Sequence, residues 1–233
     1  MKILSIDWDY FYPDSSPYDW GARESEFFIT ELWKLRVADV NLLTQVPALK
    51  EYVPTVPRGF WKKVVSNKPD LYVDDSHKEI LPLLKKGSVV TNIDAHHDFG
   101  YKEQGQLSCD NWAKIALDKG ILKEYHLVYP TWRQAEAESE NLAEVTAGVT
   151  SISYELPAKQ AYDLIFICRS GAWTPPWHDL TFSKFVGGAP HRYFLQAIDL
   201  RVFDLDKAIA DEKVMFERIM GGGKCNALNV SQL

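Results

Sequence analysis

Short apolar runs that end in acidic or polar residues recur along this chain. Runs of this length, rich in Ile, Val, Leu and Phe, are typical of buried strands. They predict strands near residues 2–7, 70–74, 88–94, 125–129, 150–155 and 163–168, with a further short strand near 198–204. Helical patterns lie between or after these runs, near residues 24–37, 77–86, 111–120 and 206–219.

The alternation of strands and helices predicts the fold class. Helices that connect successive strands place those strands parallel in one sheet and cover both of its faces. We therefore expect an α/β protein with a three-layer α/β/α architecture and a mainly parallel sheet. The 233 residues show no clean boundary, so residues 1–233 are expected to form a single domain. Three consecutive glycines open residues 221–233, which we expect to be a flexible tail.

The polar residues that follow the run near 88–94 carry the strongest chemical signal. Asp94, His96 and Asp98 stand at alternating positions. On an extended backbone such positions face the same way, so two carboxylates and an imidazole would converge. Carboxylate with imidazole and without thiolate is the ligand set of a divalent ion such as Mn²⁺, Fe²⁺, Co²⁺ or Zn²⁺. A solvated acidic turn is the alternative interpretation.

A second acidic pair follows the first predicted strand. Asp7 and Asp9 share one face of the strand end near 2–7. In open α/β sheets the ligand site lies at the carboxyl ends of the strands, so the two acidic strand ends are expected to meet. Four buried carboxylates without a cation would repel one another and some would have to protonate. A pair of metal ions removes that conflict.

His77 is the sixth candidate ligand. It follows the run near 70–74, and Ser76 with Glu79 three positions later fits a capping box, so a helix is predicted to begin there. Pro82 lies inside that helix and cannot donate a backbone hydrogen bond. His77 is thus expected at a strand-to-helix junction, within reach of the same sheet edge; a surface position is the alternative.

Together these residues resemble the binuclear-manganese ureohydrolases, the arginase and agmatinase superfamily. The similarity rests on Ser5-Ile6-Asp7-Trp8-Asp9 with Pro13, on Asp94-Ala95-His96-His97-Asp98 and on the looser match Asp75-Ser76-His77. The first two motifs stand in the reverse of their order in ordinary arginases, which is similar to a divergent arginase-like family that includes peptide arginases. Arg169-Ser170-Gly171-Ala172-Trp173 also resembles a segment of that family.

This resemblance implies an arginase- or deacetylase-like fold and two Mn²⁺ ions, or other divalent transition metals, as cofactors. The implied ligands are Asp7, Asp9, His77, Asp94, His96 and Asp98. Asp7 and Asp94 would bridge the ions. His77 and Asp98 would complete one ion, and His96 and Asp9 the other. The implied activity is hydrolysis of the guanidinium group, a linear amidine, of arginine to ornithine and urea, within a ribosomally made precursor peptide during its maturation.

Candidates for substrate binding lie in three segments. By resemblance, Glu24 would bind the guanidinium as a catalytic-site residue, with Glu26 as the second candidate. Arg169 follows the run near 163–168 and can bind a substrate carboxylate through two hydrogen bonds, or simply balance the acidic site. Residues 171–192 are rich in Trp, Pro and Gly and predict a long loop that serves as a lid or a peptide groove; an ordered surface cover that packs its own aromatic residues is the alternative.

The leaving amine needs a proton, and the sequence offers several donors. Asp110, a bridging water or His126 can supply it. Asp110 also fits an N-cap of the helix near 111–120. Residues 106–112 contain no His, whereas a His just beyond the Asp-Ala-His-x-Asp loop is the proposed shuttle in arginases.

Three other interpretations stay open. A single-zinc deacetylase of the same superfamily has a motif that Ile93-Asp94-Ala95-His96-His97 also resembles. A phosphatase with Asp7 as nucleophile and Asp9 as acid would leave the second cluster unexplained. A non-catalytic, metal-dependent peptide-binding protein would keep the metal ligands and lack a proton shuttle.

Composition narrows the function classes. A net charge of −6 without a basic stripe argues against nucleic-acid binding and mildly favours a cationic peptide partner. No apolar run reaches membrane-spanning length, and the chain opens with a strand rather than a signal peptide. Three cysteines without a Cys-x-x-Cys pair suit a reducing compartment, so a cytoplasmic location is expected.

Overall fold

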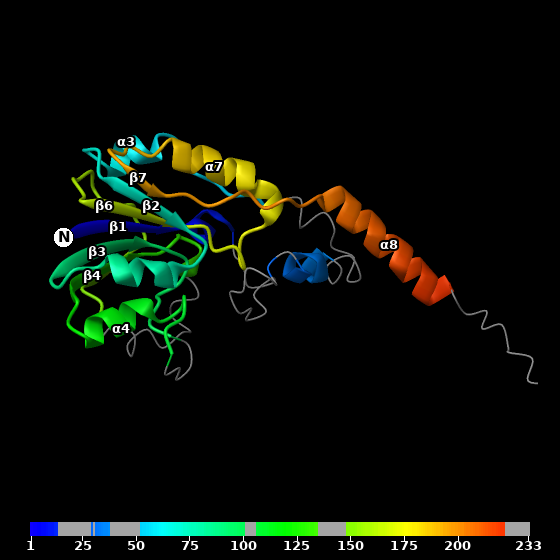
Figure 1. The fold of residues 1–233 in the computed structure, drawn as a ribbon, viewed down its shortest axis with the longest axis horizontal. Coiled ribbons are helices and arrows are strands. Elements are labelled where there is room, and N and C mark those ends of the chain that lie inside the picture. Colours follow the sequence, from blue (N-terminus) through cyan, green and yellow to red (C-terminus); the bar gives the residue numbers. More distant parts are fainter. Residues whose placement is uncertain (14–28, 30, 38–51, 101–105, 135–147, 222–233) are drawn as a thin grey trace, which may run out of the picture.

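Seven strands form one sheet in the computed structural model, which describes residues 1–13, 29, 31–37, 52–100, 106–134 and 148–221 (Figure 1). The strands are β1 (Lys2–Asp7), β2 (Asp70–Asp74), β3 (Ser88–Ile93), β4 (Leu122–Val128), β5 (Ser151–Ser153), β6 (Leu164–Cys168) and β7 (Phe194–Gln196). Their order across the sheet is β5-β4-β3-β1-β6-β2-β7, and every neighbouring pair is parallel.

Helices cover both faces of this sheet (Figure 1). On one face lie α3 (Phe60–Val64) and α7 (Asp179–Gly187), and on the other lie α4 (Trp112–Asp118) and the 3-10 helix η3 (His77–Leu83). Two short 3-10 helices, η1 (Trp8–Phe11) and η4 (Pro176–His178), and the C-terminal α8 (Leu205–Gly221) complete the named elements. The predicted three-layer α/β/α fold is confirmed, and the sheet is parallel throughout the described chain.

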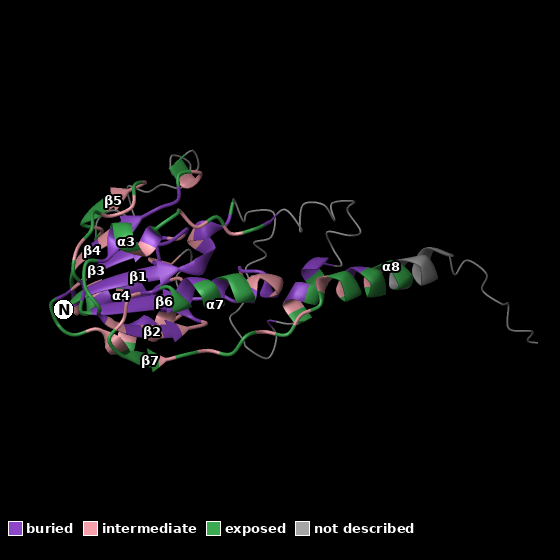
Figure 2. Ribbon diagram, turned by 90° about the horizontal axis from the view of Figure 1, so that it is seen from above, coloured by how far each residue is buried: buried purple, intermediate pink, exposed green. Residues whose placement is uncertain are grey.

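The two faces of the sheet bury separate apolar clusters because side chains alternate along a strand. On β1, Ile3 packs with α4 and η3, whereas Leu4 and Ile6 pack with α3 and α7. Figure 2 shows the central strands buried along their length, as expected for a parallel sheet covered on both faces. This burial fixes the strand ends to which the acidic residues are attached.

Three predicted elements differ from the structure. The predicted helix near 77–86 is the 3-10 helix η3, because Pro82 inside it lacks the N–H that an α-helix needs. Ser76 stands at its N-cap position, but its side chain makes no capping hydrogen bond. The short strand expected near 198–204 is wrong, because these residues form no strand; the last strand, β7, lies before them and pairs with β2 through Leu71 and Tyr72.

The long loop predicted over 171–192 contains η4 and α7. Phe182, Phe185 and Val186 are buried at helical spacing in α7, a signal that the density of Trp, Pro and Gly around them obscured. The helix predicted near 206–219 is α8. Of the predicted tail, only Gly221 lies within the described residues, as the last residue of α8.

The carboxyl ends of the parallel strands form one edge of the sheet, and the strand order reverses next to β1. The chain runs from β1 to β2 on one side of β1 and then to β3 on the other side. Crevices at the carboxyl ends of strands form where the order reverses in this way. The ends of β1, β3 and β6 are adjacent there, next to that of β2. Among the described helices, none combines the length and apolar character needed to span a membrane.

Candidate metal centre

The six predicted metal ligands lie at this edge of the sheet. Asp7 ends β1 and Asp9 lies in η1, Asp94 directly follows β3, and His77 begins η3 after β2. Within the described residues, potential ligand atoms lie within 4.8 Å of one another in three groups: His77 with Asp94 and Asp98, Asp9 with Asp94 and His96, and Asp7 with His77 and Cys168. Asp94 is therefore common to two groups that otherwise contain different residues.

His77 lies at the centre of the more deeply buried group, which contains Asp94 and Asp98. Its Nδ1 lies 3.2 Å from one carboxylate oxygen of each of Asp7, Asp94 and Asp98, and it forms no hydrogen bond. Its Nε2 lies 2.6 Å from the hydroxyl of Ser5. When Nε2 carries the proton and donates it to Ser5, Nδ1 directs a lone pair toward the three carboxylates. Such anchoring of the second ring nitrogen is typical of metal-binding His.

The second group lies closer to solvent. His96 Nδ1 is 2.9 Å from Asp9 Oδ2 and 3.7 Å from Asp94 Oδ1. Asp9 Oδ2 is buried and accepts no hydrogen bond. The two oxygens of Asp94 thus face different groups, Oδ2 toward His77 and Oδ1 toward His96. A carboxylate with this arrangement can join two cation sites.

The loop after β3 brings its ligands together by a turn rather than by an extended backbone. β3 ends at Ile93, and Asp98 has a left-handed φ of 57°. His96 therefore faces Asp9, whereas Asp98 faces His77. The expectation that alternation would aim Asp94, His96 and Asp98 at one point is corrected: they divide between two adjacent groups.

Several polar residues that the sequence reasoning missed hold the carboxylates in place. Ser170 Oγ donates to Asp7 Oδ2 at 2.6 Å, and Trp112 Nε1 donates to Asp98 Oδ2 at 2.6 Å. Asn92 Nδ2 donates to Asp94 Oδ2 at 2.9 Å. Asn92 precedes Asp94 by two positions, so alternation on β3 could have found it. Ser170 and Trp112 are distant in sequence and had no local signal for this role.

Burial and mutual repulsion shift the protonation of this cluster. Burial, with the charge of Asp7, raises the pKa of Asp9 to about 7. Burial and Asp94 raise the pKa of Asp98 well above its usual range. Burial disfavours the charged form of His77, but the carboxylates around it outweigh this and raise its pKa. The buried carboxylates are therefore stabilised by positive charge, which metal ions or protons can supply.

His126 does not reach this centre. It lies within β4, in register with Thr91 rather than at the end of the strand, and its Nδ1 is 2.8 Å from Ser151 Oγ. Its side chain instead lines a groove with Lys2, Val89 and Glu124. Strand register places His126 on the body of the sheet, away from the strand ends that carry the candidate ligands, so its role as a proton donor stays a prediction that this position does not favour.

Asp110 lies beside the first turn of α4, and its carboxylate accepts a hydrogen bond from Ser108 Oγ. The N-cap position of α4 belongs to Asn111, so the predicted N-cap role of Asp110 is also wrong. The backbone amides of Ala113 and Lys114 donate to the carbonyl of Asp98. Asp110 is in none of the three ligand groups.

Arg169 is held in a buried ion-pair network rather than directed at a substrate. Its guanidinium donates to both carboxylate oxygens of Asp75, to Asp179 at 2.7 Å and to the carbonyl of Asp199 at 2.6 Å. Arg201 also pairs with Asp179. The alternative in which Arg169 balances acidic residues fits this network, whereas a role in binding a substrate carboxylate does not. Glu24 and Glu26 lie outside the described residues.

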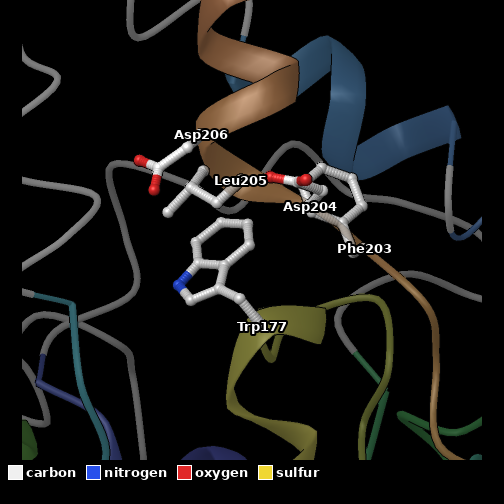
Figure 3. Close-up of a pocket in the computed structure, with 5 residues that line it drawn as sticks. All are labelled: Trp177, Phe203, Asp204, Leu205 and Asp206. Atoms are coloured by element: carbon white, nitrogen blue, oxygen red, sulfur yellow. The ribbon is translucent and has the colours of Figure 1, made fainter.

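A pocket of about 520 Å³ lies elsewhere, where Trp177 faces the start of α8 (Figure 3). Its lining residues are Trp177, Phe203, Asp204, Leu205 and Asp206, so it contains none of the six candidate ligands. The candidate metal centre is a packed cluster of mostly buried side chains.

The donor set fits a divalent cation. Asp7, His77, Asp94 and Asp98 can hold a metal ion, because three buried carboxylates surround an imidazole nitrogen that has no hydrogen-bond partner. Comparisons of this chain with models of known protein families, with curated proteins and with solved structures found no match.

Proposed function

We propose that this protein is a binuclear-metal hydrolase that converts arginine residues within a peptide to ornithine and urea. One observation carries the proposal: two ligand groups, each with a His and two Asp, share Asp94 and no other residue. A single-metal enzyme needs only one such group. The remaining carboxylates would then be buried without a function.

His77, Asp94, Asp98 and Asp7 would hold one ion, and Asp9, His96 and Asp94 the other. Asp7, which the resemblance implied as a second bridging ligand, would then bind only the first ion. Mn²⁺ suits this set of carboxylates and imidazoles. When bound, two such ions lower the pKa of a water molecule and neutralise charge that develops on the reacting group.

The residues around the centre prepare it for this chemistry. Ser5 holds the ring of His77, and Ser170 and Trp112 each fix one carboxylate. These hydrogen bonds keep the ligands at their positions before a substrate arrives, which lowers the reorganisation required during the reaction.

The substrate class rests on two arguments. The motifs from Ser5 to Pro13 and from Asp94 to Asp98 resemble those of ureohydrolases. Arg169, the candidate partner for the carboxylate of free arginine, is occupied by Asp75 and Asp179. This favours arginine within a peptide, which has no free α-carboxylate.

Asp94→Asn provides the direct test. We expect the unaltered protein to bind about two Mn²⁺ ions per chain and to release urea from an arginine-containing peptide, and the variant to lose both properties. Metal content by mass spectrometry and urea release measure them. Asp118→Asn is the matched control, because Asp118 lies on the surface of α4 in an exposed pair with Lys114.

Three results would contradict the proposal. Full urea release by the Asp94→Asn variant would refute the site. One zinc ion per chain without urea release would favour the deacetylase. Two bound metal ions without turnover of any arginine peptide would favour a peptide-binding protein.

A further inference from the structure

His96 is the most solvent-exposed of the candidate metal ligands. The His96 side chain is 19% exposed, whereas those of the other five candidate ligands are 1–5% exposed. Trp173 is half-buried and lies beside it, with its ring centroid 6.2 Å from that of His96. A substrate group that approaches the metals from the side of His96 would therefore pass close to both rings.

We propose that Trp173 binds the guanidinium group of the substrate by stacking on its planar face beside His96. The inference rests on the proposed function and names the residue that recognises the arginine side chain. Arginine stacks on aromatic faces because its guanidinium is planar and weakly hydrated. The indole ring of Trp173 lies beside the most exposed candidate ligand, where such a cation would approach the metal ions.

The segment that carries Trp173 is held rigidly. The carbonyl oxygens before it are all occupied: Gly171 accepts from Trp33 at 2.9 Å and from Arg201 at 2.7 Å, and Ala172 accepts from Arg36. The Trp173 amide donates to the Ser170 carbonyl at 2.8 Å. A backbone fixed in this way limits the positions that the ring can take, which reduces the conformational entropy lost when a ligand binds.

The same segment is tied to the metal centre itself. Ser170, three residues before Trp173, donates its hydroxyl to Asp7. Thr174 Oγ1, on the other side, donates to the carbonyl of Arg169 at 2.7 Å. The backbone segment that carries Trp173 is therefore linked to the candidate ligand Asp7 by a direct hydrogen bond. A purely packing role for Trp173 against His96 is the competing explanation, and it predicts a loss of metal rather than a loss of substrate affinity.

Steady-state kinetics with Trp173→Ala and Trp173→Phe separate the two roles. We expect Trp173→Ala to raise KM for an arginine peptide roughly tenfold, with kcat and metal content nearly unchanged, and Trp173→Phe to restore most of the loss. Inhibition by the matching citrulline peptide, which is planar but neutral, should change little. Trp61→Ala is the control, since Trp61 is partly buried in α3 and donates to Phe185.

The outcomes are distinct. Urea release with an unchanged KM in Trp173→Ala would overturn this inference and leave the hydrolase proposal intact. Loss of metal in that variant, or equal weakening of the arginine and citrulline peptides, would assign Trp173 to packing and also overturn it. No urea release by the unaltered protein would overturn the proposed function and this inference with it.

Discussion

Ser170 combines an unusual backbone conformation with a contact to a candidate ligand. Its φ of 51° lies in the left-handed region, which costs a residue with a Cβ about 1 kcal/mol or more relative to glycine. Its hydroxyl donates to Asp7, and its amide lies 3.3 Å from Cys168 Sγ. Residues in this conformation persist where surrounding contacts hold them, and they concentrate at functional sites.

Two substitutions at Ser170 separate the effect of its hydrogen bond to Asp7 from the effect of its positive φ. Ser170→Ala and Ser170→Gly both remove the hydrogen bond to Asp7, and we expect each to weaken metal binding by roughly tenfold or more. Ser170→Gly should unfold with a free energy about 1 kcal/mol higher than Ser170→Ala, because glycine adopts a positive φ freely. Denaturant unfolding and metal titration provide the measurements. Equal stability of the two variants would show that the left-handed backbone is not a source of strain.

The sequence predicted the side chains of the cluster better than it predicted their geometry. The spacing of Asp94, His96 and Asp98 marked them as a group, and strand ends explained why Asp7 would join them. The division into two groups depends on the left-handed Asp98, which no spacing rule reveals. Ser170 is 163 residues from its partner Asp7, so only the completed sheet brings them together.

Helix α4 supports the centre through its first turn. The amides of Ala113 and Lys114 donate to the carbonyl of Asp98, and the indole of Trp112 donates to its carboxylate. Trp112 also packs its ring 5.1 Å from that of His77. This element therefore fixes both the backbone and the side chain of one candidate ligand and touches a second.

Trp112→Phe tests this support. Phenylalanine keeps most of the buried ring but lacks the indole donor, so Asp98 loses a hydrogen bond worth about 1.5–3 kcal/mol for a charged acceptor. We expect metal affinity to fall roughly tenfold or more. Trp61→Phe removes an indole donor to a backbone carbonyl far from the cluster and should leave metal affinity unchanged. Equal metal affinity in both variants would contradict the assigned role of α4.

The buried strands with long apolar runs could be predicted from the sequence. The elements whose form depends on their neighbours in the fold could not. The apolar strands near 2–7, 70–74 and 163–168 were located within a residue because burial on both faces of a parallel sheet demands apolar runs. Residues 77–83 form a 3-10 helix instead of the predicted α-helix, because Pro82 lies within it and β3 begins only a few residues later. β7 has only three residues at the sheet edge, and its apolar residues Phe194 and Leu195 are exposed, so it lacks the long apolar run of a buried strand.

The protonation of the cluster links the centre to the stability of the molecule. In the metal-free protein the pKa of Asp9 is raised from 3.8 to about 7 by burial and by Asp7. Between these pH values the folded state holds a proton that the unfolded state has released. The contribution of Asp9 to the free energy of unfolding therefore falls as pH rises from about 4 to about 7.

Unfolding of the protein across this pH range, with a chelator and with Mn²⁺, checks this effect. The decline should appear with the chelator and shrink with Mn²⁺, because the cations replace the protons. In the metal-free Asp9→Asn variant the decline should be smaller than in the unaltered protein, since that group no longer titrates. An identical pH profile for the two metal-free proteins would show that Asp9 has an ordinary pKa.

β6 is synthesised after β1 to β5, yet it lies between β1 and β2. A growing chain that has emerged only as far as β5 leaves one edge of β1 open and cannot yet position Ser170. Until β6 emerges, β1 and β2 each lack a neighbouring strand on at least one edge. Such unpaired edges can pair incorrectly and can bind chaperones. Correct folding on the ribosome therefore depends on the arrival of a single late strand.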